Sequence, residues 1–202
     1  VKGDANGLLR KFKARFVAKG FYQREGIDFI ATYAPVATYT SIKMIISTAA
    51  QLGLKAFQFD VEGALLLPDI DVPLYISDEH GNCYLCYKTL YGLKQSANAW
   101  NRELHNELTA LGMTQFVIDP CVYTRLTKEG WMILACWVDD IIGACTTDKQ
   151  IREFLKEFKH PFSASGSFDY CLNIKVETTA CGLIGLTQTG CNRSYGQDVQ
   201  RT

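Results

Sequence analysis

The sequence lacks any long apolar run. None of its 202 residues lies in a stretch of 18 consecutive apolar residues, the length at which a transmembrane helix is expected. The first residues, VKGDANGLLRKFK, also lack the apolar segment of a signal peptide. These absences predict an intracellular chain with no membrane partner.

The chain also lacks a net charge, because 21 basic side chains balance 21 acidic ones. The charges are unevenly distributed. Residues 1 to 25 hold seven basic groups and two acidic ones, a local charge of +5 (7 − 2), so the remaining residues carry −5. The basic groups are Lys2, Arg10, Lys11, Lys13, Arg15, Lys19 and Arg24. A basic arm on an acidic body suits a polyanionic partner if cations mask the acids, although a solvated basic surface gives the same pattern.

Internal repeats, low-complexity tracts and a clear linker are absent as well. With 48% hydrophobic residues, the chain can bury a core as one domain, or as one domain with a small appendage. Eight cysteines do not indicate disulfides, because most lie in apolar runs where a free thiol acts as a small hydrophobic group. His80, Cys83 and Cys86 have a zinc-like spacing. However, CYLCY is typical of a strand that points the two cysteines to opposite faces, and no second pair lies nearby.

Three segments have the apolar period of a helix. The first runs from Ile42 to Leu52, with Thr40 or Ser41 as its N-cap and Gly53 at its end. The second runs from Ala97 to Leu111, with Ser96 as cap and Gly112 as stop. The third opens with a capping box from Thr147 to Gln150 and is closed by Pro161.

Strand patterns alternate with these helices. They cover 54–61, 72–76, 83–88, 121–126, a hairpin over 131–145, and 170–176. This order predicts an α+β fold, an antiparallel or mixed sheet with helices on one face. After about residue 178 the period is lost, which predicts a poorly packed end.

The hairpin WMILACWVDDIIGAC places two acids, Asp139 and Asp140, in the most apolar part of the chain. Two unpaired buried charges would be costly, so the acids are expected in the turn. A solvent-facing turn explains an isolated pair, whereas a divalent cation site needs a third carboxylate. In AFQFDVEGALLL, strand alternation places Asp60 on the same face as Gln58. Asp60 can therefore supply the third carboxylate.

Five ordered motifs resemble the reverse transcriptase of copia-type (Pseudoviridae) retrotransposons. They are KARFVAKGFYQREGIDFIATYAPVA, FDVEGALL, LYGLKQSANAW, DPCVYTR and WVDDIIGA, spread over about residues 11–177. The resemblance implies an RNA-directed DNA polymerase within a right-hand fold, with fingers and palm subdomains in residues 1–202 and the palm a split βαβ sheet. It implies neither thumb nor ribonuclease H within this stretch.

The resemblance also implies roles for individual residues. Asp60, Asp139 and Asp140 match the catalytic acids, and with the Val61 carbonyl they would hold two Mg²⁺ ions, for which Mn²⁺ can substitute. Nucleotide-binding positions are Lys13, Arg15, Lys19, Leu65 and Gln95. The implied partners are dNTPs, an RNA or DNA template with its primer, and the polyprotein's integrase and ribonuclease H. An intact element would place the domain in a cytoplasmic virus-like particle.

The chain departs from the family pattern at four places: Trp137, the pair Ala97 and Asn98, Asn173, and Leu65, where an aromatic ring is usual. These departures support an alternative, an inactive remnant that keeps the fold as a nucleic-acid-binding module. A metal-dependent nuclease would use the same acids, but it leaves LYGLKQ and the basic arm without a role.

Overall fold

A computed structural model describes residues 2–3, 9–11, 14–164, 170–172, 174–178 and 184–187. The chain divides into two compact units, which are described separately. The first unit comprises residues 1–34 and 64–102, and the second comprises residues 35–63 and 103–202. Within the described ranges, no helix combines the length and the apolar character that crossing a lipid bilayer requires.

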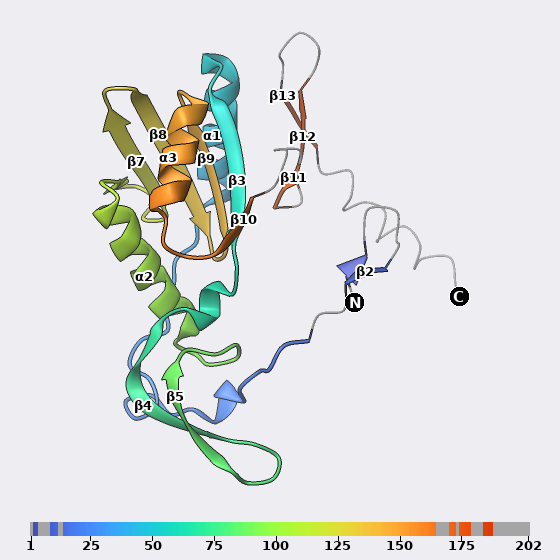
Figure 1. Cartoon of the computed structure of the whole chain (residues 1–202), viewed down its shortest axis with the longest axis vertical. Helices are drawn as coiled ribbons and strands as arrows, with labels where there is room; N and C mark the ends of the chain where they lie inside the picture. The colour runs from blue at the N-terminus through green and yellow to red at the C-terminus, as the bar shows by residue number, and fades with distance from the viewer. Residues whose placement is uncertain are drawn as a thin grey trace. The chain divides into compact units, whose positions relative to one another are not determined.

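The second unit is built on an antiparallel sheet (Figure 1). The strand order is β10 (Phe162–Ala164), β3 (Lys55–Val61), β9 (Asp140–Cys145), β8 (Gly130–Trp137), β7 (Val122–Thr127) and β6 (Thr114–Gln115). Along the chain, α2 (Ser96–Ala110) falls between β3 and β8, and α3 (Asp148–Glu157) falls between β9 and β10. The order β10-β3-β9-β8 puts β9 between β3 and β8. The predicted combination of helices with an antiparallel sheet is confirmed.

Helices cover both faces of this sheet, so the prediction of helices on one face is wrong for α1 (Tyr39–Leu52). Phe59 of β3 contacts Phe154 of α3, with ring centroids 6.1 Å apart. The neighbouring positions on the sheet, including Ile142 and Ala144, point the other way and pack against Ile42, Ile45 and Ile46 of α1. Figure 1 shows α3 in front of the sheet and α1 behind it. The sheet is apolar on both faces because both are covered.

The ends of two helices differ from the predicted ones. Thr38, rather than Thr40 or Ser41, caps α1, because its side chain accepts a hydrogen bond from the Ser41 amide. Ser96 begins α2, but its hydroxyl donates to the Leu90 carbonyl oxygen (2.6 Å). The capping box from Thr147 to Gln150 is confirmed at the start of α3. That helix ends at Glu157, before Pro161 is reached.

The strand predictions are confirmed for β3, β5 (Cys83–Lys88), β7 and the hairpin β8–β9, with small changes of bounds. Several described strands were not predicted, namely β1 (Lys2–Gly3), β2 (Leu9–Lys11), β6, β10 and β13 (Ile184–Thr187). The strands β11 (Tyr170–Cys171), β12 (Ile174–Thr178) and β13 form a small antiparallel sheet. The strand β13 therefore lies in the region after about residue 178, which was predicted to be poorly packed. The other residues of that region are outside the described ranges.

The first unit contains a ribbon of β4 (Asp69–Ser77) and β5, with the short helices η1 (Gly20–Tyr22) and η2 (Ala64–Leu66). Its core is formed by Leu74, Cys86 and Leu93. The segment before η1 lies against the loop before α2, because the Ala18 amide donates to the Tyr91 carbonyl oxygen (2.8 Å). Two glycines make this approach possible: a Cβ atom built on Gly20 would lie 1.9 Å from the Gly92 oxygen.

Two described cysteines, Cys83 and Cys86, have the arrangement that the sequence predicts. Cys83 is exposed and Cys86 is buried, so they lie on opposite faces of β5. Burial raises the pKa of the Cys145 thiol to about 11 and raises the pKa of Cys136 as well. Thiols in this state are poor nucleophiles and poor metal ligands.

Candidate active site

Of the two acids in the β8–β9 hairpin, Asp139 lies in the tight turn, as predicted, whereas Asp140 is the first residue of β9. Trp137 and Asp140 are the last paired residues of β8 and β9, so the turn consists of Val138 and Asp139. Val138 has a φ of 55°, which is in the left-handed region that a β-branched residue rarely adopts. Such strain is found most often at functional sites. Asp139 is exposed, and Asp140 is half-buried.

Asp60 lies directly beside this turn. On β3, the buried residues Phe57, Phe59 and Val61 alternate with Ala56, Gln58 and Asp60, as predicted. Asp60 is the register partner of Asp140 on β9. Residues paired in this way point to the same side of a sheet, with Cβ atoms about 4.5 to 5.5 Å apart. The fold therefore brings the predicted first acid next to the predicted hairpin acids.

The main chain ties β3 to the turn. The Val61 amide donates a hydrogen bond to the Asp139 carbonyl oxygen, with 2.8 Å between nitrogen and oxygen. In a strand the N–H and C=O of one residue point the same way, so the Val61 carbonyl is also directed towards the turn. That direction is compatible with the predicted role of this oxygen as a ligand.

The chemistry of these donors fits a hard divalent cation. Two carboxylates directly opposite on neighbouring strands repel each other, and Mg²⁺ prefers oxygen ligands, of which one or two are usually carboxylates. Among the residues that the structure describes, no three His, Cys, Asp or Glu side chains lie close enough together to bind one metal ion. Asp60 and Asp140 are thus the pair that could hold a cation, and Asp139 would join them from the turn.

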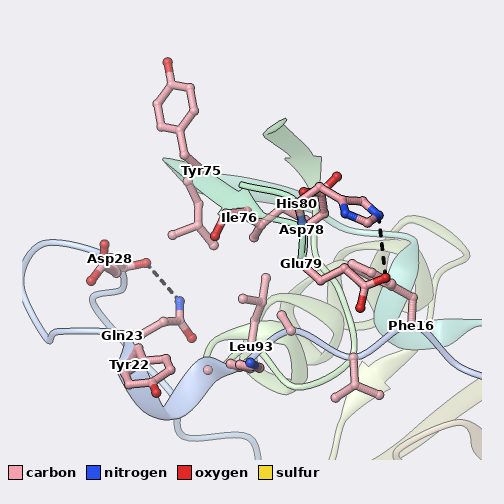
Figure 2. Close-up of a pocket in the computed structure, with 16 residues that line it drawn as sticks. Phe16, Tyr22, Gln23, Asp28, Tyr75, Ile76, Asp78, Glu79, His80 and Leu93 are labelled. Carbon is pink, nitrogen blue, oxygen red and sulfur yellow. Dashed lines mark hydrogen bonds and ion pairs between the residues drawn. The ribbon is translucent and has the colours of Figure 1, made fainter. Parts of the chain in front are cut away.

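The predicted nucleotide-binding residues that are described belong to the first unit. Arg15 is exposed, and its guanidinium carbon lies 5.2 Å from the centre of the Tyr91 ring. Lys19 is exposed and lines a cavity of about 900 Å³ (Figure 2). Aromatic, acidic and apolar groups share its wall, including Tyr22, Tyr75 and Asp78. Lys13 lies outside the described residues, as does Asn173 among the departures.

Gln95 is buried in the first unit, and both ends of its side-chain amide form hydrogen bonds there. Its Oε1 accepts a hydrogen bond from Gln23 Nε2 (2.9 Å), and its Nε2 donates to the Asp28 carbonyl oxygen (3.1 Å). Figure 2 shows Gln23 turned towards Asp28. The observed contacts of Gln95 therefore shape the loop over residues 23–28. The other predicted residue, Leu65, is half-buried in η2, where its carbonyl oxygen accepts a hydrogen bond from the Thr89 hydroxyl (2.9 Å).

Sequence reasoning missed a buried carboxylate, Asp119, that links the start of α1 to the start of β7. Asp119 is only 4% exposed and accepts hydrogen bonds from the Thr38 amide, the Ser41 hydroxyl and the Cys121 amide. Burial raises the pKa of Asp119, but these donors outweigh it and hold the pKa below its ordinary value. Asp119 thereby joins the start of α1 to β7. The motif DPCVYTR contains this residue but gives no sign of its distant partners.

Comparison with known proteins identifies the family to which the chain belongs. Residues 2–194 match the family model described as reverse transcriptase (RNA-dependent DNA polymerase). The chain belongs to this family. The reverse transcriptase chain is 36% identical over 152 residues to the retrovirus-related Pol polyprotein from transposon TNT 1-94 of Nicotiana tabacum. It is 31% identical over 192 residues to the retrovirus-related Pol polyprotein from transposon RE1 of Arabidopsis thaliana.

These two matches cover 70% and 90% of the reverse transcriptase chain. The chain itself spans only 11% and 13% of the length of the two relatives. No solved structure matches it significantly. The copia-type resemblance drawn from the five motifs is confirmed by the family match and by these relatives.

Proposed function

We propose that this reverse transcriptase chain is the RNA-directed DNA polymerase domain of a copia-type retrotransposon polyprotein. The first unit would supply the fingers and the second unit the palm. The observation that carries the proposal is the pairing of Asp60 with Asp140 beside a strained acidic turn. The match of residues 2–194 to reverse transcriptases gives that acidic pair a chemical context.

The reaction is the attack of a primer 3′-hydroxyl on the α-phosphate of a dNTP, with pyrophosphate as the leaving group. Asp60, Asp140, Asp139 and the Val61 carbonyl would hold two Mg²⁺ ions, or Mn²⁺ in their place. The ions supply positive charge to the attacking and leaving oxygens. The apolar strands β3, β8 and β9 form a rigid base that fixes the carboxylates before substrate arrives.

The first unit provides groups suited to the rest of the nucleotide. Arg15 and Lys19 are exposed cations that can bind the triphosphate, and Lys13 is a third candidate. Gln95 would act by shaping the loop over residues 23–28. Leu65 would lie by the nucleotide sugar. The template, the primer and the other polyprotein domains, integrase and ribonuclease H, are the proposed partners.

Primer extension tests the proposal. The 202-residue chain is incubated with a primed RNA template, dNTPs and Mg²⁺ or Mn²⁺, and a matched reaction contains a chelator. We expect nucleotide addition that the chelator abolishes. No addition under either cation would contradict the proposal.

A noncatalytic nucleic-acid-binding module is the second candidate. It is favoured by the lack of an assembled three-carboxylate cluster among the described residues, and by the departures at Trp137, Ala97 and Leu65. This candidate predicts an inactive chain that still binds primer-template in a salt-sensitive manner. Replacing Lys11 and Lys13 together by alanine should weaken that binding.

A further inference from the structure

Gln58 contacts one of the hairpin acids directly. It lies on β3 two residues before Asp60, and therefore on the same face of the sheet. Its register partner is Ile142, two residues beyond Asp140, which makes the Gln58 and Asp140 side chains diagonal neighbours. Gln58 Nε2 donates a hydrogen bond to Asp140 Oδ1 over 3.2 Å. The chemistry proposed above uses the acids and leaves Gln58 without a role.

The neutral charge of Gln58 suits this contact. Asp60 and Asp140 are register partners on β3 and β9, so their like-charged carboxylates repel each other. A lysine or arginine at this position would cancel the charge that a cation needs. An amide N–H fixes one carboxylate oxygen and leaves the negative charge in place. The Gln58 contact thus orients Asp140 without neutralising it.

The carbonyl oxygen of the Gln58 amide, Oε1, takes no part in the contact with Asp140. This oxygen is buried and accepts no hydrogen bond from the described part of the chain. A buried acceptor without a donor destabilises a fold, and each such group in a native protein calls for an explanation. Turning the amide over would pair this oxygen with the Asp140 carboxylate and replace an attraction by a repulsion. The observed orientation is therefore set by the bond to Asp140.

We propose that Gln58 is a positioning residue, which holds the Asp140 carboxylate in the orientation that a divalent cation shared with Asp60 requires. The proposal rests on the proposed function, because it assigns the cation to the same acids. Groups that orient a metal ligand through a hydrogen bond typically change metal affinity or activity by about 10- to 100-fold when they are replaced. Gln58 acts through Asp140 and needs no contact with substrate.

Cation binding to the free protein tests this role without an activity assay. Mn²⁺ is titrated into the 202-residue chain by calorimetry, with Gln58→Met as the test variant, because methionine has a similar length and no donor. Gln51→Met is the matched control, since Gln51 is exposed on α1. We expect the Gln58 variant to bind Mn²⁺ at least about 10-fold more weakly. The control should bind like the parent, and all three proteins should melt alike without cation.

A double-mutant cycle separates positioning from general damage. In an Asp140→Asn background, Gln58→Met should cause no further loss of Mn²⁺ affinity, because the partner through which Gln58 acts is already gone. Independent, additive losses would overturn the positioning role. If Gln58→Met melts at a lower temperature, Gln58→Asn replaces it, since asparagine keeps the amide but is one methylene shorter.

The Asp60→Asn variant distinguishes a failure of the proposed function from a failure of the positioning role of Gln58 alone. If this variant binds Mn²⁺ as the parent does, or the parent binds none, the acids are not a cation site and the proposed function fails together with the role of Gln58. If Asp60→Asn loses binding while Gln58→Met keeps the parental affinity, only the positioning role is overturned. Loss in both variants, with the predicted cycle, supports both.

Discussion

The amide of Val61 donates a hydrogen bond to the carbonyl oxygen of Asp139 over 2.8 Å. This bond joins the end of β3 to the turn between β8 and β9, so the residue after Asp60 is fixed against the residue before Asp140. The acids therefore lie on neighbouring strands with a main-chain bond between them. Rigid support of this kind is what a site for charged groups requires, because small displacements weaken electrostatic interactions at a reacting centre.

The buried carboxylate of Asp119 should contribute strongly to stability. Asp119→Ala leaves the Thr38 amide, the Ser41 hydroxyl and the Cys121 amide without their acceptor. We expect a loss of about 2 to 4 kcal/mol in the free energy of unfolding, measured by urea denaturation. Asp69→Ala is the control, because Asp69 is an exposed carboxylate with a single surface ion pair. Equal losses in both variants would contradict the role of Asp119.

The pH dependence of stability follows from the same residue. The pKa of Asp119 is lower in the folded chain than its ordinary value, so the unfolded chain binds the proton more readily. The stabilisation is therefore present above the ordinary aspartate pKa of about 3.9 and is lost as pH falls through the lower folded pKa. Denaturation curves between about pH 6 and pH 3 should show a smaller acid-induced loss in Asp119→Ala than in the parent. A parallel loss in both proteins would remove Asp119 as its source.

The close approach of Gly20 and Gly92 predicts that a side chain at Gly92 destabilises the fold, and Gly81 provides the control. Gly92 has a φ of 87°, and a Cβ atom there would lie 2.2 Å from the Ala18 carbonyl oxygen. Gly81 has a φ of 83° and open space around it. Gly81→Ala should cost only the left-handed backbone term, about 1 kcal/mol. Gly92→Ala should cost about 1 to 3 kcal/mol more, measured by thermal unfolding. Equal costs would mean that the segment before η1 does not lie where the structure places it.

Leu65 should affect the choice between nucleotide sugars. An aromatic ring, usual at this position in the family, would exclude a ribose 2′-hydroxyl by overlap, whereas leucine is shorter. We expect Leu65→Phe to reject ribonucleotides more strongly than the parent, by about 1 to 3 kcal/mol in the ratio of kcat/KM values. The measurement compares each dNTP with its rNTP in both proteins. Leu66→Phe, one residue along η2, is the control, and unchanged selectivity in Leu65→Phe would remove Leu65 from this role.

Local patterns were sufficient to predict part of the fold. The bounds of β5 and the capping box at Thr147 follow from interactions within a few residues, and the structure confirms both. The placement of Asp60 opposite the acidic turn followed from strand alternation together with the family resemblance. The cap of α1 could not be chosen locally, because Thr38, Thr40 and Ser41 are all good caps. Asp119, distant in sequence, bonds to Thr38 and Ser41 at the observed start.

The remaining features depend on contacts between distant residues. β10 was missed because PFSA contains a proline and no alternation, and its pairing comes from the free edge of β3. The position of α1 on the second face of the sheet is set by packing against Ile142 and Ala144. Gln58 and Gln95 bond to residues 82 and 72 positions away. No periodicity in the sequence could indicate either pair.

Single-nucleotide addition by Asp60→Asn tests the central claim most directly. A primed RNA template, one dNTP and saturating Mg²⁺ are mixed with the parent, with Asp60→Asn, and with Asp69→Asn as an exposed aspartate that undergoes the same chemical change. The account predicts addition by the parent and by Asp69→Asn, and a loss of at least about 1000-fold in Asp60→Asn, or about 4 kcal/mol of transition-state stabilisation. Near-parental addition by Asp60→Asn would contradict the assignment of the acidic hairpin as the active site.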